Sequence, residues 1–176
     1  MKSCSFFGHR NTPKTPKLCD KIRCTVLNLI VNDNVDTFLF GSASSFDRLC
    51  LEVVTQIKTE YPKIKLIYYR SHYANISESY KDYLLKSYDD TLMPDRVENA
   101  GRASYVERNQ AMIDASDICV FYFNPDYKPP LRKYSKRNCI EYQPKSGTQL
   151  SLNYAQRKAL KNSGMKIINL FDDSIT

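Results

Sequence analysis

The sequence lacks any run of apolar residues long enough to cross a membrane, although 42% of its 176 residues are hydrophobic. A membrane-spanning helix needs about 20 consecutive, mostly apolar residues. The first residues, 1–11, also lack the apolar segment of a secretory signal peptide. We therefore expect a cytoplasmic protein that has no membrane partner.

Metal-binding residues are scarce as well. The two histidines are His9 and His72, and the pair Cys19 and Cys24 has neither the spacing of a CxxC motif nor that of a typical zinc site. Three further cysteines lie in or beside apolar runs: Cys4, Cys50 and Cys119. These three are expected to be reduced residues of the core, as is usual in the cytoplasm. The sequence gives no reason to expect a metal ion or a cofactor.

Acidic residues are fewer than basic ones, 19 against 26, which leaves a net charge of +7. Much of the excess lies in residues 126–145, where six basic residues accompany two acidic ones. One interpretation is a solvated loop. The other is a positively charged segment that attracts a phosphorylated ligand or a nucleic acid.

A chain of this length is expected to form a single domain, residues 1–176, in which the basic loop at about 124–146 is an insertion. Short apolar runs predict five strands, at 3–7, 37–40, 64–69, 118–123 and 166–170. Helical periodicity predicts five helices, at 18–31, about 45–60, 80–85, 103–115 and 148–162. The alternation predicts an α/β fold: a Rossmann-like open, mostly parallel sheet of about five strands with helices on both faces.

The clearest strand-to-helix transition is the stretch Gly41-Ser-Ala-Ser-Ser-Phe-Asp47, where Ser44 or Ser45 is the candidate N-cap. The same order of strand, small residues and helix recurs at 6–10 and, less clearly, at 146–148. The first turn of a helix offers unpaired N–H groups and a positive dipole end, which suit phosphate. Because the carboxyl ends of parallel strands meet at one edge of a sheet, we expect these loops to form a ligand crevice.

Four motifs occur in order along the chain: Cys4-Ser-Phe-Phe-Gly-His-Arg10, Gly41–Asp47, Tyr105–Asp117 before a strand, and Ser146-Gly-Thr148. Together they resemble the YpsA-like branch of the SLOG superfamily, which is named for the SMF/DprA and LOG proteins. The resemblance covers nearly the whole chain except the basic loop. It implies a Rossmann-like sheet whose strand ends bind nucleotides or nucleotide-derived ligands. Some members cleave N-glycosidic bonds of nucleotides, some bind single-stranded DNA, and some sense nucleotide signals.

Ten residues in these motifs are candidates for ligand contacts: Gly8, His9, Arg10, Gly41, Ser42, Asp47, Arg108, Asn109, Gly147 and Thr148. Gly8 permits close backbone approach, Arg10 could clamp a phosphate, and His9 could stack on a base or cap a helix. The alternative is a turn glycine followed by two solvated side chains.

The other candidates also have two interpretations each. Ser42 could donate to phosphate or ribose, and Asp47 could accept from ribose hydroxyls. An aspartate in the first turn of a helix is also stabilising by itself, by up to about 1 kcal/mol. Arg108 either reaches the crevice or pairs with Asp114 or Glu107.

The segment 146–148 either holds a phosphate on backbone N–H groups or is an ordinary N-cap loop. The resemblance to enzymatic LOG proteins implies Pro-Gly-Gly-x-Gly-Thr, with a catalytic acid in the following turn. Here Lys145-Ser146 replaces the glycine pair, and Leu150 and Ser151 stand where the acid belongs. Glycosidic cleavage needs a positioned carboxylate. The acids that could substitute are Glu78, Glu98, Glu107 and Glu141.

We therefore predict a module that binds or senses a nucleotide-derived ligand, without enzymatic activity. One alternative is a LOG-type hydrolase of nucleotides whose acid has moved. Another is a DprA-type binder of single-stranded nucleic acid that uses the basic loop, although no series of aromatic platforms interleaved with basic residues is evident. Assembly into a homo-oligomer is left open.

Overall fold

The computed structural model of the protein describes residues 2–41, 44–129, 146–161, 164–172, 174 and 175. Its strands are β1 (Lys2–Gly8), β2 (Val35–Phe40), β3 (Lys65–Tyr69), β4 (Asp90–Leu92), β5 (Ile118–Tyr122), β6 (Lys166–Asn169) and β7 (Ser174–Ile175). Its α-helices are α1 (Pro16–Val31), α2 (Ser45–Glu60), α3 (Glu78–Leu85), α4 (Asp95–Glu98), α5 (Ser104–Asp114) and α6 (Gly147–Lys161), and a 3₁₀ turn, η1 (Gly101–Ala103), precedes α5.

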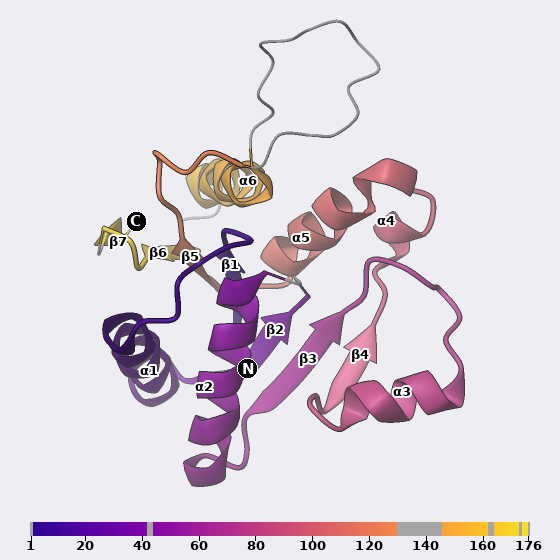
Figure 1. Cartoon of the computed structure of the whole chain (residues 1–176), viewed down its shortest axis with the longest axis horizontal. Coiled ribbons are helices and arrows are strands. Elements are labelled where there is room, and N and C mark those ends of the chain that lie inside the picture. The colour runs from indigo at the N-terminus through magenta and orange to yellow at the C-terminus, as the bar shows by residue number, and fades with distance from the viewer. Residues whose placement is uncertain (1, 42–43, 130–145, 162–163, 173, 176) are drawn as a thin grey trace, which may run out of the picture.

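All the strands belong to one sheet in the order β4-β3-β2-β1-β5-β6-β7, with helices on both faces (Figure 1). Strands β1 to β6 are parallel, and β7 is antiparallel to β6. The predicted Rossmann-like α/β fold is confirmed. The chain adds strands on one side of β1 up to β4 and then returns to its other side with β5. The boundary between β1 and β5 is therefore a topological switch point, where open α/β sheets usually bind ligands.

Two strands were not predicted. β4 has three residues and lies in a stretch that the sequence marks as acidic and irregular, and β7 has two. Neither strand is long enough to show the alternation or the apolar run by which a strand is recognised. The two strands lie at opposite edges of the sheet, where each pairs with a neighbouring strand on one side only.

Side-chain hydrogen bonds define where the first two helices begin. Thr15 is the N-cap of α1 and accepts from the N–H of Leu18. Ser44, one of the two predicted candidates, is the N-cap of α2 and accepts from the N–H of Asp47 at 3.1 Å. The hydroxyl of Ser45 instead donates to the carbonyl of Arg10 at 2.8 Å. The loop after β1 is thereby tied to the start of α2.

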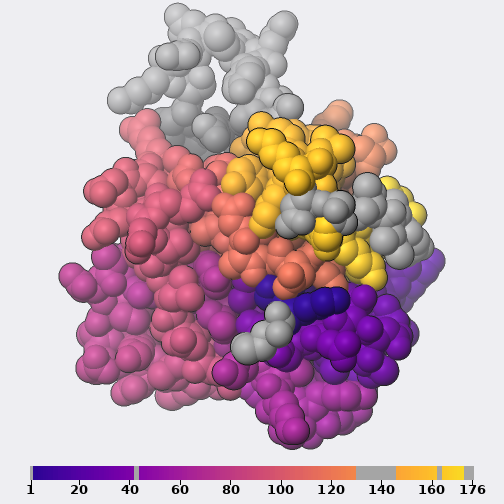
Figure 2. Space-filling model, turned by 180° about the vertical axis from the view of Figure 1, so that it is seen from behind, coloured from indigo at the N-terminus to yellow at the C-terminus, as the bar shows by residue number. Residues whose placement is uncertain are grey.

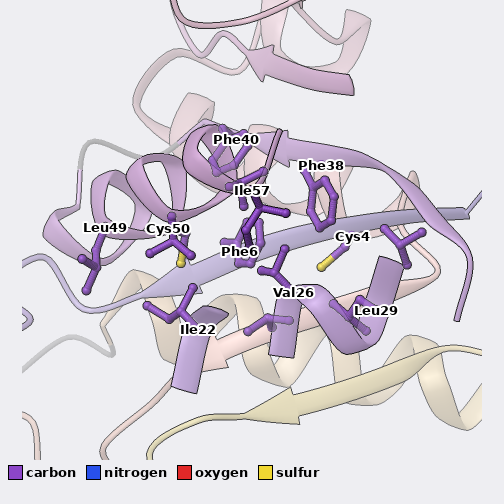
Figure 3. Packing of buried hydrophobic residues seen from close by; sticks show 14 of the residues in the cluster. Cys4, Phe6, Ile22, Val26, Leu29, Phe38, Phe40, Leu49, Cys50 and Ile57 are labelled. Carbon is purple, nitrogen blue, oxygen red and sulfur yellow. The ribbon is translucent and has the colours of Figure 1, made fainter. Parts of the chain in front are cut away.

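The core has two parts, one on each face of the sheet. Phe6 and Phe7 are adjacent on β1 and therefore point to opposite faces. Phe6 stacks on Phe38 and Phe40, with ring centroids 6.0 and 5.3 Å apart, beneath α1 and α2 (Figure 3). Phe7 stacks on Phe121 at 5.1 Å beneath α5 and α6. Because β1 is covered on both faces, its residues from Cys4 to Phe7 are buried.

The three cysteines that the sequence assigns to the core lie there. Cys4, Cys50 and Cys119 are buried and free, whereas Cys24 is exposed on α1. Burial raises the pKa of each buried thiol, and that of Cys119 to about 12. Among the helices that the structure describes, none is both long and apolar enough to span a membrane.

These environments predict the pattern of thiol modification. Iodoacetamide at mildly alkaline pH should alkylate Cys24 in the folded protein and should leave Cys4, Cys50 and Cys119 unmodified, because alkylation requires an accessible thiolate. Peptide mass mapping with and without guanidinium measures this. Modification of Cys50 in the folded protein at the rate of Cys24 would contradict the closed core.

Candidate functional site

The carboxyl ends of β1, β2, β3 and β5 lie at one edge of the sheet, because these strands are parallel. Helices α2 and α6, which follow β2 and β5 in the chain, begin at this edge (Figure 1). This is the edge at which the sequence predicts the ligand crevice.

Arg108 is the central side chain at this edge. Its side chain is buried, with 3% of the residue exposed, although α5 is a surface helix. The Nη1 group donates to the carbonyl of Gly41 and, at 3.5 Å, to that of Tyr69, at the ends of β2 and β3. Burial lowers the pKa of Arg108, while the nearby Asp47 carboxylate acts in the opposite direction. Within the described part of the chain, Nη2 has no hydrogen-bond partner.

A second set of hydrogen bonds continues from Arg108 to α6. The Nε group of Arg108 donates to Asn109 Oδ1 at 2.9 Å, and Asn109 Nδ2 donates to Ser151 Oγ at 2.9 Å. The Ser151 hydroxyl in turn donates to the carbonyl of Gly147 at 3.0 Å. From the sequence alone, Ser151 stands out only because no acid occupies this position. Its spacing of four residues from Gly147, which places both on one face of the helix, is the signal that could have predicted this hydrogen bond.

Of the two interpretations of Arg108, the structure supports the one in which it reaches the sheet edge. Its proposed partners Glu107 and Asp114 bind Arg96 instead, each with an N–O distance of 2.7 Å. Two other acids considered as catalytic substitutes lie elsewhere, Glu78 at the start of α3 and Glu98 in α4. Glu141 lies outside the described residues.

Asp47 is the one carboxylate that is buried at this edge within the described residues, with 2% of the residue exposed. It lies in the first turn of α2, where its charge also favours the helix. Burial and, less strongly, the Asp47 carboxylate raise the pKa of Tyr88. Asp47 therefore acts electrostatically on Tyr88, which precedes β4, and on Tyr68 of β3 as well as on Arg108.

His9 is buried, and it joins β1 to the segment after β5. Its Nε2 accepts from the N–H of Asn124 at 2.9 Å, and its ring stacks on Tyr127 with centroids 3.8 Å apart. Burial lowers the pKa of His9. A nitrogen that accepts a hydrogen bond carries no proton, so the bonded imidazole is neutral. At least one face of the ring is thus already occupied by the protein.

Two of the candidate glycines are required by packing within the protein. A Cβ at Gly8 would lie 2.3 Å from Cγ of Phe46, and a Cβ at Gly41 would lie 2.8 Å from Cδ of Arg108. The space beside these two glycines is therefore occupied by side chains of the protein itself and not left for a ligand. Gly147 differs, because a Cβ there would meet nothing within 4 Å.

The start of α6 has the geometry of an anion site. Ser146 Oγ accepts from the N–H of Gln149 at 3.1 Å and caps the helix, and the first turn contains no acidic residue. A pocket of about 50 Å³ lies beside it, lined by Tyr105, Asn109, Gln110, Gly147, Leu150 and Ser151. The lining, which also includes Val106, is mostly apolar, and the volume is too small for a whole nucleotide.

The remaining predicted residues are placed as follows. The Arg10 side chain is exposed at the end of β1, and Thr148 is buried in the first turn of α6. Ser42 and most of the basic loop, residues 130–145, lie outside the described residues. Among the described residues, no group of three His, Cys, Asp or Glu is arranged to hold a metal ion. Contact between a ligand and any of the ten candidate residues remains a prediction.

Comparison with protein families identifies a match. A protein-family model described as the YspA SLOG family matches residues 4–157, which run from β1 into α6 and include every candidate residue. A search of curated proteins finds no match.

The packing at the glycines predicts their tolerance to substitution. Gly8→Ala should destabilise the protein by about 1–3 kcal/mol, because the buried Phe46 ring has no room to move away. Gly147→Ala is the matched control and should change stability by less than about 0.5 kcal/mol. Urea denaturation measures both. Equal effects of the two substitutions would show that Gly8 is not needed for packing.

Proposed function

Because the chain belongs to the YspA SLOG family, we propose that it binds a nucleotide or nucleotide-derived ligand at the carboxyl edge of its sheet. Membership supports a nucleotide-related function in general. The more specific role, a binding or sensing module that holds the ligand without cleaving it, is the proposal.

The observation that carries the proposal is the open start of α6, fixed beside Arg108. The hydrogen bonds from Arg108 through Asn109 and Ser151 hold the first turn of α6 in place. Apart from the N–H of Gln149, which Ser146 caps, the first N–H groups of a helix such as α6 have no partner within the helix and carry a positive partial charge, so they can bind phosphate without a dedicated side chain. Open space at Gly147 leaves room for such a group. The Nη2 group of Arg108 supplies a further donor with no partner in the described chain.

The position of the acids favours a binder over a hydrolase. The first turn of α6 has no carboxylate, and Glu107 is held by Arg96. A second candidate function nevertheless rests on Asp47, because a buried carboxylate near Arg108 is what a displaced catalytic acid would look like. Binding of single-stranded nucleic acid depends on the basic loop, most of which lies outside the described residues.

Arg10, which the sequence analysis assigns to phosphate, follows β1 at the same edge of the sheet, and this assignment predicts the effect of removing its side chain. Arg10→Ala should weaken the binding of nucleoside monophosphates by about tenfold to a hundredfold, since a hydrogen bond to a charged group contributes about 1.5–3 kcal/mol. Its stability should be unchanged, because the side chain is exposed. Arg157→Ala is the control, because Arg157 is exposed on the same helix as Gly147 but ten residues further along. Isothermal titration calorimetry gives both affinities, and equal affinities of the two variants would remove Arg10 from the site.

The proposal also predicts that the protein does not release free base from nucleoside monophosphates. Loss of one general acid typically lowers a rate by about 10²–10⁴. Chromatography after prolonged incubation with the common ribo- and deoxyribonucleotides checks this. Repeated turnover that disappears in Asp47→Asn, while nucleotide binding remains, would establish the hydrolase instead.

A further inference from the structure

Three exposed aromatic side chains gather beside the proposed site from two separate parts of the chain. His72 and Tyr73 belong to the loop between β3 and α3, and Tyr105 belongs to the first turn of α5. The ring centroids of His72 and Tyr105 are 4.9 Å apart with the planes nearly perpendicular, and the Tyr73 ring lies 6.2 Å from that of His72. Tyr73 is 73% exposed and Tyr105 54% exposed. Large aromatic surfaces are therefore available for stacking.

The loop that presents two of these rings is braced by the protein. The Nη1 group of Arg70 donates to the carbonyl of Tyr73 and, at 3.3 Å, to that of Ala74. The N–H of Arg70 donates to Leu92 of β4 at 2.8 Å, which anchors the brace to the sheet. Tyr73 has φ of 60°, a left-handed conformation that is unfavourable for a bulky residue. A strained conformation that is held by hydrogen bonds, with its ring left in solvent, is typical of a functional site.

Tyr105 links this group of rings to the proposed phosphate site. Its ring centroid lies 5.8 Å from the guanidinium carbon of Arg108, within the range of a cation–π interaction. Tyr105 also lines the pocket that contains Gly147 and Ser151. Figure 2 shows the side of the molecule on which α5 and α6 lie next to each other. One ligand could thus reach from the start of α6 to the Tyr105 ring.

We propose that Tyr105, together with His72 and Tyr73, forms a subsite that stacks the base of a nucleotide whose phosphate lies at the start of α6. This inference rests on the proposed function and adds the residues that recognise the base. Exposed aromatic faces bind bases by stacking, whatever the base.

The charge around the rings favours one base over a strand of nucleic acid. Residues 70–105 contain five basic and six acidic residues, so the segment carries almost no net charge. A strand with several phosphates requires a positively charged groove beside the stacking platforms. A mononucleotide needs positive charge only at its phosphate, which the start of α6 and Arg108 provide.

Calorimetry with three kinds of probe tests the subsite: the four common ribonucleoside monophosphates, adenosine, which has no phosphate, and ribose 5-phosphate, which has no base. In the wild-type protein the nucleotides should bind about 5- to 150-fold more tightly than ribose 5-phosphate, which is the usual contribution of stacking one base. Tyr105→Ala should abolish this difference, so that the nucleotides bind no more tightly than ribose 5-phosphate does to the same variant. Tyr105→Phe, which keeps the ring, should retain it. Tyr83→Ala is the control, because Tyr83 is 63% exposed on α3 outside the subsite.

Comparison of the probes separates the failure of the subsite from the failure of the proposed function. Unchanged nucleotide affinity in Tyr105→Ala would overturn the subsite and leave the proposed function standing. Equal loss of affinity for nucleotides and ribose 5-phosphate would also overturn it, because Tyr105 would then only support Arg108. Adenosine binding that depends on Tyr105, with no contribution from phosphate, would support the subsite and overturn the phosphate site at α6. Absence of binding by every probe would overturn both.

Discussion

The buried guanidinium of Arg108 is the interaction on which the candidate site depends. Placing an arginine inside a protein costs free energy unless hydrogen bonds replace its hydration. Here the carbonyls of Gly41 and Tyr69, at the ends of two parallel strands, provide them. Any movement of α5 along the sheet edge would break these bonds and leave the charge buried without acceptors. Through Asn109, the same constraint extends to the first turn of α6.

The three glycine loops at this edge have different physical roles. Gly8 and Gly41 allow Phe46 and Arg108 to pack against the ends of β1 and β2, so protein atoms fill the space that a ligand would need there. His9 closes the edge further, because its ring packs under Tyr127. Of Gly8, Gly41 and Gly147, only Gly147 has open space where a Cβ would lie. The side of the edge between α5 and α6 is therefore the side that a phosphate can approach.

Much of the fold was predictable because long helices and buried strands leave clear patterns in a sequence. The apolar residues of α2 that recur with helical spacing are all buried: Phe46, Leu49, Cys50, Val53, Val54 and Ile57. β4 left no such pattern because it is short and lies at an edge. The sequence correctly predicted that the three loops lie at one edge of the sheet, since this follows from parallel topology alone. The packing of Phe46 against Gly8 could not be predicted, because it depends on the distance between α2 and β1, and no local sequence pattern contains that distance. The contact between the rings of His72 and Tyr105 could not be predicted for the same reason.

Electrostatics give a reason for a site that holds a ligand rather than cleaving it. Cleavage of an N-glycosidic bond passes through a sugar with positive charge, which a carboxylate must stabilise. The start of α6 and the Arg108 guanidinium both contribute positive charge, which favours a bound phosphate and disfavours a cationic sugar. Asp47, the buried carboxylate of this edge in the described chain, belongs to α2, on the opposite face of the sheet from α5 and α6. In the proposed binding mode, the positive groups would lie at the phosphate and the acid on the other face of the sheet, an arrangement that would stabilise the intact nucleotide more than its transition state for cleavage.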